Sequence, residues 1–245
     1  MLGRGVFDFS KPTELIKYFL SLRINEQDDN DFIVLDFFSG SATTAHATMK
    51  INAEDSGKRK YIMVQVPEKC PEGSTAQKAG YSTIPAIAKE RIRRAGAKIK
   101  EASPLTTPDL DTGFRVFKLA DSNMNDVYYA AGDYTQDLLT TLGSNVKSDR
   151  TDLDLLFGCL LEWGLPLSMP YQSEKIEGCT VHTYNDGDLI ACFNENIPDT
   201  VIKELARRQP LRAVFRDSSF YGSPAKINVG EIFKMLAPDT RVKVI

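Results

Sequence analysis

The fold is decided by the stretch Asp36-Phe37-Phe38-Ser39-Gly40-Ser41-Ala42-Thr43-Thr44-Ala45-His46. It follows the apolar run Phe32-Ile33-Val34-Leu35, which predicts a buried parallel strand over residues 32–37. A turn of small residues comes next, and a helical pattern covers residues 42–52. A strand, a tight turn and a helix form the nucleotide site of a doubly wound sheet, because the turn amides and the helix dipole face the ligand. The carboxylate of Asp36 at the strand end favours a ligand with a positive charge or an amine over a pyrophosphate.

Composition sets the class of protein. The chain has 245 residues, of which 42% are hydrophobic and 26% charged, as in an ordinary globular protein of one large or two small domains. A net charge of −3 is low for a protein that binds DNA alone, so any DNA contact is expected from a local patch or from parts outside this chain. The apolar runs are short and no secretion signal is recognised, so we expect a cytoplasmic protein with no membrane contact. Four scattered cysteines and two histidines predict reduced buried thiols and no metal site.

Strands and helices alternate in the first part of the chain, which predicts a parallel sheet. The expected elements are a helix at 13–22, strands at 32–37 and 60–66, helices at 42–52 and 84–99, and a strand at 114–119. Residues 70–81 are expected to form a loop and residues 101–112 a linker. We therefore predict a first domain at residues 1–118 and a second at 119–245.

The second region has the pattern of a small α/β module. The strongest signal is Asn185-Asp186-Gly187-Asp188, which predicts a hairpin between strands at 180–184 and 189–193. The other expected elements are helices at 152–163, 199–208 and 227–236 and strands at 211–215 and 241–245. Asp199 or Thr200 is the expected cap of the helix at 199–208.

Several motifs together resemble a known family. Phe7-Asp8-Phe9-Ser10-Lys11-Pro12 resembles the segment that precedes the cofactor strand of β-class amino DNA methyltransferases, and residues 36–44 resemble their FxGxG cofactor motif. Residues 60–68 and 81–95 are similar to the modification subunit of type III restriction systems, as are 215–218 and 226–228. The order of these segments is more specific than any single motif, and it implies the C-terminal part of such a subunit.

The resemblance implies a Rossmann-like sheet, present in part, that binds S-adenosylmethionine in the first domain. It implies a C-terminal α/β module for assembly or dimerisation in the second. The cofactor residues it implies are Ser10, Lys11, Pro12, Asp36, Phe37, Phe38, Ser39, Gly40, Ser41, Thr43, Thr44 and Gln65. Two positions depart from the family pattern. Ala42 replaces the second glycine of FxGxG, and Gln65 stands where many relatives carry a Glu that binds the ribose hydroxyls, so a charge-assisted bond is lost.

The family's catalytic tetrapeptide, Asp/Asn/Ser-Pro-Pro-aromatic, is absent from this sequence. The nearest string, Ser168-Met169-Pro170-Tyr171, follows the cofactor motif, whereas the β-class places its catalytic motif upstream, so we reject it. The exocyclic amine of adenine is a weak nucleophile and needs hydrogen-bond acceptors and an aromatic stack to react. We therefore assign no catalytic residue, and we expect a part of a subunit that binds cofactor at best and transfers no methyl group alone.

For the intact subunit the resemblance implies an adenine-specific DNA methyltransferase of a type III restriction-modification system. Its implied partners are double-stranded DNA, a second copy and a helicase-nuclease restriction subunit. One alternative is an assembly module with a vestigial cofactor site, and another is a Rossmann-like enzyme for a different nucleotide, whose GxGxxG is missing. The basic residues of helix 84–99, Arg91 among them, are expected on a solvated face, with contact to the DNA backbone as the alternative. His46 is expected to be a packing or surface residue and not a catalytic one.

Overall fold

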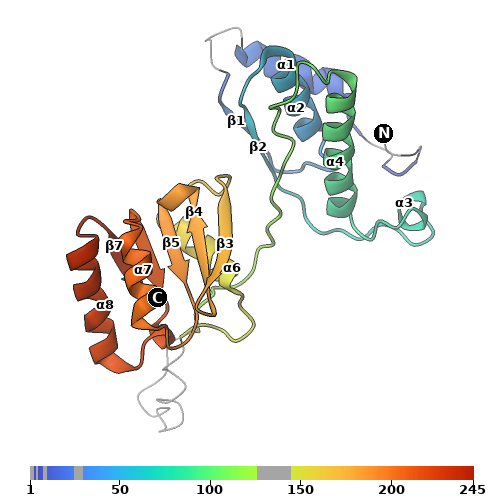
Figure 1. Cartoon of the computed structure of the whole chain (residues 1–245). Coiled ribbons are helices and arrows are strands. Elements are labelled where there is room, and N and C mark those ends of the chain that lie inside the picture. The colour runs from blue at the N-terminus through green and yellow to red at the C-terminus, as the bar shows by residue number, and fades with distance from the viewer. Residues whose placement is uncertain (1–2, 4, 8–9, 25–29, 126–144) are drawn as a thin grey trace. The chain divides into compact units, whose positions relative to one another are not determined.

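The structure, a computed structural model, describes residues 3, 5–7, 10–24, 30–125 and 145–245. The chain forms two compact units, Met1–Phe114 and Arg115–Ile245, each of which is described by itself (Figure 1). Asp8 and Phe9 of the first motif lie outside the described residues, as do residues 126–144. Among the described helices, none is both long and apolar enough to span a bilayer.

The first unit contains the predicted strand–helix–strand arrangement. Its elements are α1 (Thr13–Ile24), β1 (Ile33–Asp36), α2 (Thr43–Asp55), β2 (Lys60–Met63), α3 (Thr75–Lys78) and α4 (Ile84–Ala102). Strands β1 and β2 pair in parallel, with Ile33 opposite Lys60 and Asp36 opposite Met63. The parallel pairing confirms that prediction, and the loop after Asp36 lies at the carboxyl end of β1.

Helices α2 and α4 cover one face of this two-stranded sheet (Figure 1). Small side chains allow this close packing. The cluster is Ala42, Ala45, Met49, Ala88, Ile92 and Ala95, with Tyr61 and Met63 of β2 packed against it. Helix α1 packs on α2, where Lys17 and Glu54 form an ion pair of 2.5 Å.

The other face of the sheet is apolar and exposed. Ile33 is 61% exposed, and Leu35, Ile62 and Val64 are exposed as well. The prediction of a buried strand is therefore wrong for this face of the sheet, because no described element covers it. Isolated two-stranded sheets are marginal in water, and parallel strands are normally covered on both faces. The two-stranded sheet therefore resembles part of a larger sheet.

Two further predictions for the first unit are corrected. The predicted loop at 70–81 contains the one-turn helix α3, whose cap Ser74 accepts a hydrogen bond from the backbone N–H of Gln77. The linker predicted at 101–112 packs on its own unit, because Thr107 is buried and Thr112 lies against Gly96 of α4.

The predicted strand at 114–119 is wrong, since these residues have no regular secondary structure. Their alternating side chains pack locally instead. Arg93 lies 5.5 Å from the ring centroid of Phe114, and the rings of Phe117 and Phe157 are 5.1 Å apart. Arg115 donates to the carbonyl of Met169 at 2.6 Å. The alternation of apolar and basic residues over 114–119 therefore comes with side-chain packing and not with a partner strand.

The second unit is built on a five-stranded sheet within the described residues, in the order β3-β4-β5-β6-β7. Its elements are α6 (Asp152–Glu162), β3 (Tyr171–Ile176), β4 (Cys179–Tyr184), β5 (Leu189–Cys192), α7 (Asp199–Arg207), β6 (Arg212–Phe215), α8 (Gly222–Leu236) and β7 (Arg241–Val244). Strands β3 to β5 run antiparallel, and β5 to β7 run parallel. The hairpin of β4 and β5 confirms the turn signal. Its four-residue loop, 185–188, has positive φ values at Asn185, Asp186 and Gly187, which are residue types that adopt them more readily than most.

Alternate residues of the central strands face two separate cores. Ile190 and Phe215 pack with α7 and α8, whereas Leu189 and Val214 pack with α6 on the other face (Figure 1). All four side chains are buried. The second unit therefore covers both faces of its central strands.

Details at the edges of the second unit differ from prediction. Strand β3 was not predicted, because four of its six residues are polar and it lies at an edge of the sheet. Pro198 is the N-cap of α7, so neither Asp199 nor Thr200 caps it, and the Thr200 hydroxyl donates instead to Glu177. Helix α8 begins at Gly222, earlier than predicted.

Candidate functional site

Asp36 organises the loop that leads from β1 to α2. Its Oδ1 accepts a hydrogen bond from the backbone N–H of Phe38 at 3.2 Å, and its Oδ2 accepts one from the Thr44 hydroxyl at 2.6 Å. One carboxylate thus joins the start of the loop to the first turn of α2. Because each carboxylate oxygen can accept more than one hydrogen bond, Asp36 retains capacity for a ligand ammonium group.

Gly40 occupies a position where a side chain would be strained and crowded. Its φ is +51°, and a Cβ there would lie 3.2 Å from the ring of Phe7. Its backbone N–H donates to Oε1 of Gln65 at 2.8 Å. Gln65 therefore fixes the loop backbone in this structure, and its contact with a ribose stays a prediction.

Ala42 is the N-cap of α2 and has left-handed backbone angles, φ 58° and ψ 44°. This is where the family motif has its second glycine, the residue that adopts such angles without steric cost. The Ala42 side chain is fully buried and packs with Ala45 and Met49. The departure from glycine therefore acts through backbone strain, because the methyl group is buried in the core.

Arg91 of α4 joins the segment before α1 to the loop. Its Nη1 donates to the hydroxyls of Ser10 and Ser41, the latter at 2.7 Å, and its Nη2 donates to the Thr13 hydroxyl at 3.3 Å. The oxygens of Ser10 and Ser41 lie 3.2 Å apart, and that of Thr43 lies 3.4 Å from Ser10. We call these five residues the hydroxyl–arginine cluster.

The prediction that Arg91 lies on a solvated face is wrong, since its exposed fraction is only 7%. Its spacing gives the reason, because Arg91 falls three residues after Ala88 and four before Ala95 on the apolar stripe of α4. The burial of Arg91 could have been predicted from that spacing. Arg93 and Arg94 are exposed and both pair with Glu90, so part of the basic face is neutralised within α4.

His46 is a packing residue, which is one of the two roles expected of it. It is buried on α2, and its Nδ1 lies 3.3 Å from the Thr13 hydroxyl. Burial, followed by the nearby positive charge of Arg91, lowers the pKa of His46 to about 4. The imidazole is therefore neutral near pH 7, so Arg91 is the charged member of this corner of the unit.

The structure brings most of the predicted cofactor residues together. Ser10, Ser41 and Thr43 meet in the hydroxyl–arginine cluster, and the residues hydrogen-bonded to the loop are Asp36, Thr44 and Gln65. Ser39 is buried, and its N–H donates to the carbonyl of Val64. The remaining predicted residues, Lys11, Pro12, Phe37 and Phe38, point to solvent, and Phe38 is 85% exposed.

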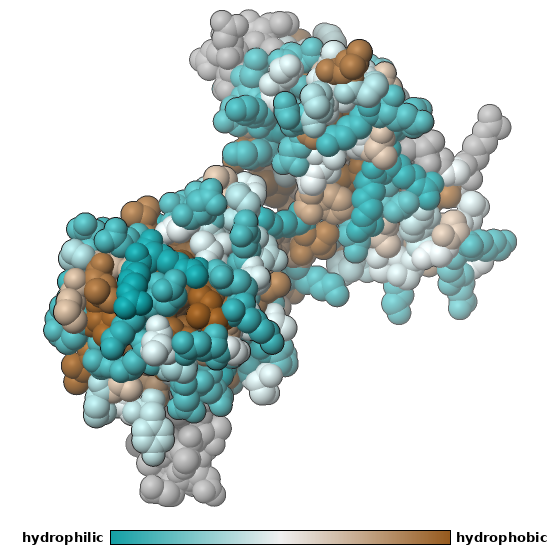
Figure 2. All heavy atoms as spheres, in the orientation of Figure 1, coloured by the Kyte–Doolittle hydropathy of each residue, from teal (hydrophilic) through white to brown (hydrophobic). Residues whose placement is uncertain are grey.

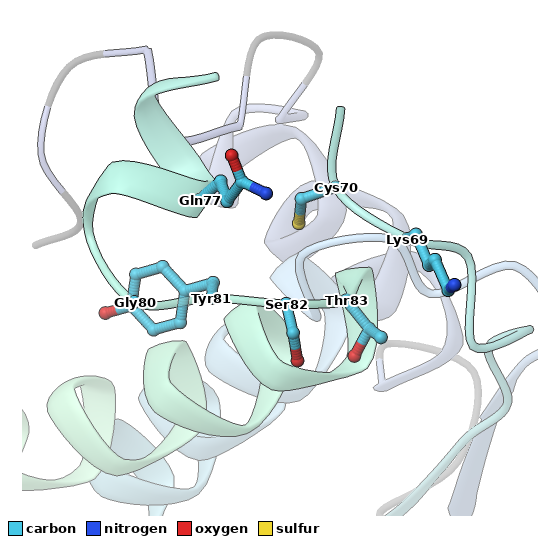
Figure 3. A pocket seen from close by; sticks show the side chains of 7 residues that line it. All are labelled: Lys69, Cys70, Gln77, Gly80, Tyr81, Ser82 and Thr83. Atoms are coloured by element: carbon cyan, nitrogen blue, oxygen red, sulfur yellow. The ribbon is translucent and has the colours of Figure 1, made fainter. Parts of the chain in front are cut away.

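Hydrophobic patches interrupt the mostly hydrophilic surface on the face of the molecule shown in Figure 2. A separate hollow of about 460 Å³ lies near α3 and the start of α4, and Figure 3 shows the side chains around it. It is lined by Lys69, Cys70, Gln77, Gly80, Tyr81, Ser82 and Thr83. None of the predicted cofactor residues lines it. Over the described ranges, no group of three or more His, Cys, Asp or Glu side chains is placed to hold a metal ion.

The sequence of the chain is similar to proteins of one class, the methyltransferases of restriction-modification systems. No protein-family profile matches the chain. Over 120 residues, 49% of this chain, it is 45% identical to the type III restriction-modification enzyme StyLTI Mod subunit of Salmonella typhimurium, of which it covers 18%. Over 220 residues, 85% of this chain, it is 28% identical to the EcoP15I Mod subunit of Escherichia coli, of which it covers 31%. Over 92 residues, 38% of this chain, it is 36% identical to the type II methyltransferase M.KpnI of Klebsiella pneumoniae, of which it covers 21%.

These similarities confirm the resemblance inferred from the motifs. The chain is homologous to part of the Mod subunits of type III restriction-modification enzymes. It spans between 18% and 31% of the length of the relatives compared here.

Proposed function

We propose that this chain is the C-terminal part of an adenine-specific DNA methyltransferase subunit, and that its first unit holds S-adenosylmethionine. The observation that carries the proposal is the loop after β1. Asp36, Gly40 and Ser41 occupy the positions of the family's cofactor motif, between a parallel strand and a helix, in a chain homologous to Mod subunits. The intact subunit then acts on double-stranded DNA, forms a dimer and works with a restriction subunit.

The polar groups around the loop suit the amino-acid end of this cofactor. The carboxylate of Asp36 accepts from an ammonium group, while the hydroxyls of Ser10 and Ser41 donate to a carboxylate. When bound, the cofactor supplies an activated methyl group on its sulfonium. The residues of this chain bind and orient it, with Gln65 holding the Gly40 amide in place.

The same chain does not transfer a methyl group alone in this proposal. It lacks the Pro-Pro-aromatic tetrapeptide that would hold the flipped adenine and activate its amine. The exposed apolar face of β1 and β2 agrees with this, because the rest of a methyltransferase sheet and its covering helices would bury Ile33 and Leu35. We therefore propose that residues 1–118 are the cofactor half of a larger domain.

Calorimetric titration with S-adenosylmethionine tests the proposal, comparing the wild-type chain with Asp36→Asn and Asp111→Asn. Asp111 is a matched control, because its Oδ1 also accepts a backbone N–H two residues later, that of Gly113 at 2.8 Å. We expect saturable binding that Asp36→Asn weakens and Asp111→Asn preserves. A folded wild-type chain without binding, or an equal effect of both substitutions, would refute the cofactor site.

A second candidate function, assembly through residues 119–245, is favoured by the surface around α8. Tyr221 is 89% exposed, and Ile227 and Met235 of α8 are also exposed. We propose that this surface docks the helicase-nuclease restriction subunit. In a pull-down with that subunit, Tyr221→Ser with Ile227→Ser is expected to abolish retention, and retention equal to wild type would exclude this surface.

A further inference from the structure

Two buried arginines in the first unit have contrasting environments. Arg59 is buried with a counter-ion, since its guanidinium donates to both oxygens of Asp55 at 2.9 and 2.8 Å. Arg91 is also buried, but among the described residues no carboxylate lies within ion-pair distance of it. Burial of an unpaired charge is costly, so buried charges in proteins are normally paired. Arg91 therefore has an environment that an anion would complete.

The protons of the cluster point to the same conclusion. Both Nη1 protons of Arg91 are donated to hydroxyl oxygens, and its Nε–H is buried without a partner. Ser10 and Ser41 each have one hydroxyl proton, and only one of the two can lie between their oxygens, which are 3.2 Å apart. At least one hydroxyl proton remains for an acceptor from outside the pair. Thr43, whose oxygen lies 3.4 Å from that of Ser10, is one such acceptor, and the carboxylate of a ligand would be a stronger one.

The loop contacts one charged side chain of each sign, Asp36 and Arg91. Asp36 at the end of β1 is bonded to Phe38 and Thr44, while Ser41 between them is bonded to Arg91. A ligand that carries both an ammonium and a carboxylate matches this arrangement, with the ammonium at Asp36 and the carboxylate at the hydroxyls. An uncharged or purely cationic ligand would bring no anion to Arg91.

We propose that Arg91, with Ser10 and Ser41, forms a site for the carboxylate of the bound cofactor. The two hydroxyls donate to the carboxylate, and Arg91 is a positioning residue behind them. Because Arg91 donates to the hydroxyl oxygens, it turns their protons away from itself and toward the ligand, and its charge strengthens those hydrogen bonds. This inference rests on the proposed function, since it names the part of S-adenosylmethionine that the cluster recognises.

The alternative is that Arg91 only ties the segment at Ser10 and Thr13 to the loop. A tie of this kind affects every ligand of the loop equally, whereas a carboxylate site affects only ligands that have a carboxylate. The two are separated by titrating S-adenosylmethionine and decarboxylated S-adenosylmethionine into the wild-type chain, Arg91→Gln and Ser41→Ala. Circular dichroism checks that each variant is folded, and Arg91→Lys keeps the charge where Arg91→Gln fails to fold.

We expect Arg91→Gln to weaken S-adenosylmethionine binding by about 10- to 100-fold, the range for a lost hydrogen bond to a charged group. The same substitution should change binding of the decarboxylated compound by less than about 3-fold, and Ser41→Ala should show the same selectivity. Equal losses for both ligands would overturn the carboxylate site and leave the cofactor proposal standing. Failure of the folded wild-type chain to bind either ligand would overturn the cofactor proposal and this inference with it.

Discussion

Replacing Ala42 with glycine tests whether strain is stored at the start of α2. Ala42 has left-handed backbone angles, which cost a residue with a Cβ roughly 1–2 kcal/mol. Ala47, in the interior of the same helix, is equally buried but has helical geometry. Ala47→Gly is therefore the matched control, because it removes the same methyl group from the same helix without relieving strain.

The expected magnitudes follow from opposing effects. Ala42→Gly loses a buried methyl group, worth about 0.8 kcal/mol, and raises the entropy of the unfolded chain by roughly 0.4–1 kcal/mol. Relief of the left-handed strain offsets both, so the net change in unfolding free energy is expected within about 1 kcal/mol of zero. Ala47→Gly loses the same methyl group and about 0.8–1.0 kcal/mol of helix propensity, a total of about 1.7 kcal/mol.

Hydrogen exchange in urea, read by mass spectrometry on peptides from α2 and β2, measures the stability of the first unit directly. Fluorescence does not serve here, because Trp163 is the only tryptophan of the chain and lies in the second unit. We expect Ala47→Gly to lower the protection of α2 by at least about 1 kcal/mol more than Ala42→Gly does. Equal losses in the two variants would refute the strain at Ala42.

Three further predictions concern buried polar groups. The pKa of His46 is near 6.5 in the unfolded chain and about 4 in the folded one, so the first unit should lose up to about 1.4 kcal/mol of stability per pH unit as pH falls between these values. Urea titrations at several pH values measure the unfolding free energy of the wild type and of His46→Asn. The same dependence of that free energy on pH in both proteins would disprove the prediction. Arg59→Met should lower the unfolding free energy of the first unit by about 1.5–3 kcal/mol, because it removes the charged hydrogen bonds from the buried guanidinium to Asp55, and an unchanged stability in urea would contradict this. Burial raises the pKa of the Cys159 thiol to about 11 and that of Cys192 to about 12, so neither should react with a thiol reagent at about pH 8 before unfolding, and rapid labelling of the native chain would contradict this.

Features set by neighbouring residues could be predicted well. The strand at β1, the small-residue turn and helix α2 follow one another directly, and each has its own local signal of apolar residues, small residues or helical spacing. The hairpin of β4 and β5 could be predicted for the same reason, since Asn185, Asp186 and Gly187 are consecutive residues of types that readily adopt the positive φ found there. Strand β3 could not, because an edge strand with one exposed face needs few apolar residues.

Features that depend on distant residues needed the tertiary structure. Arg91 lies 50 positions from Ser41 and 81 from Ser10, so no local pattern could show that they meet. The spacing of α4 placed Arg91 on the apolar stripe, but the charge of the side chain suggested solvent instead. The bond from Gly40 to Gln65 likewise joins residues 25 positions apart.

The sequence by itself determined the resemblance to Mod subunits and the strand–turn–helix order of the first unit, because motif order and local structural signals are properties of consecutive residues. Only the tertiary structure decided what surrounds that loop. Packing of α4 on α2 places Arg91 within hydrogen-bonding distance of the Ser10 and Ser41 hydroxyls. Ala42 is buried between the same helices with left-handed backbone angles. One face of the sheet stays apolar and exposed. The physical reason is that burial and charge pairing are set by which elements pack together, and a linear pattern does not contain those contacts.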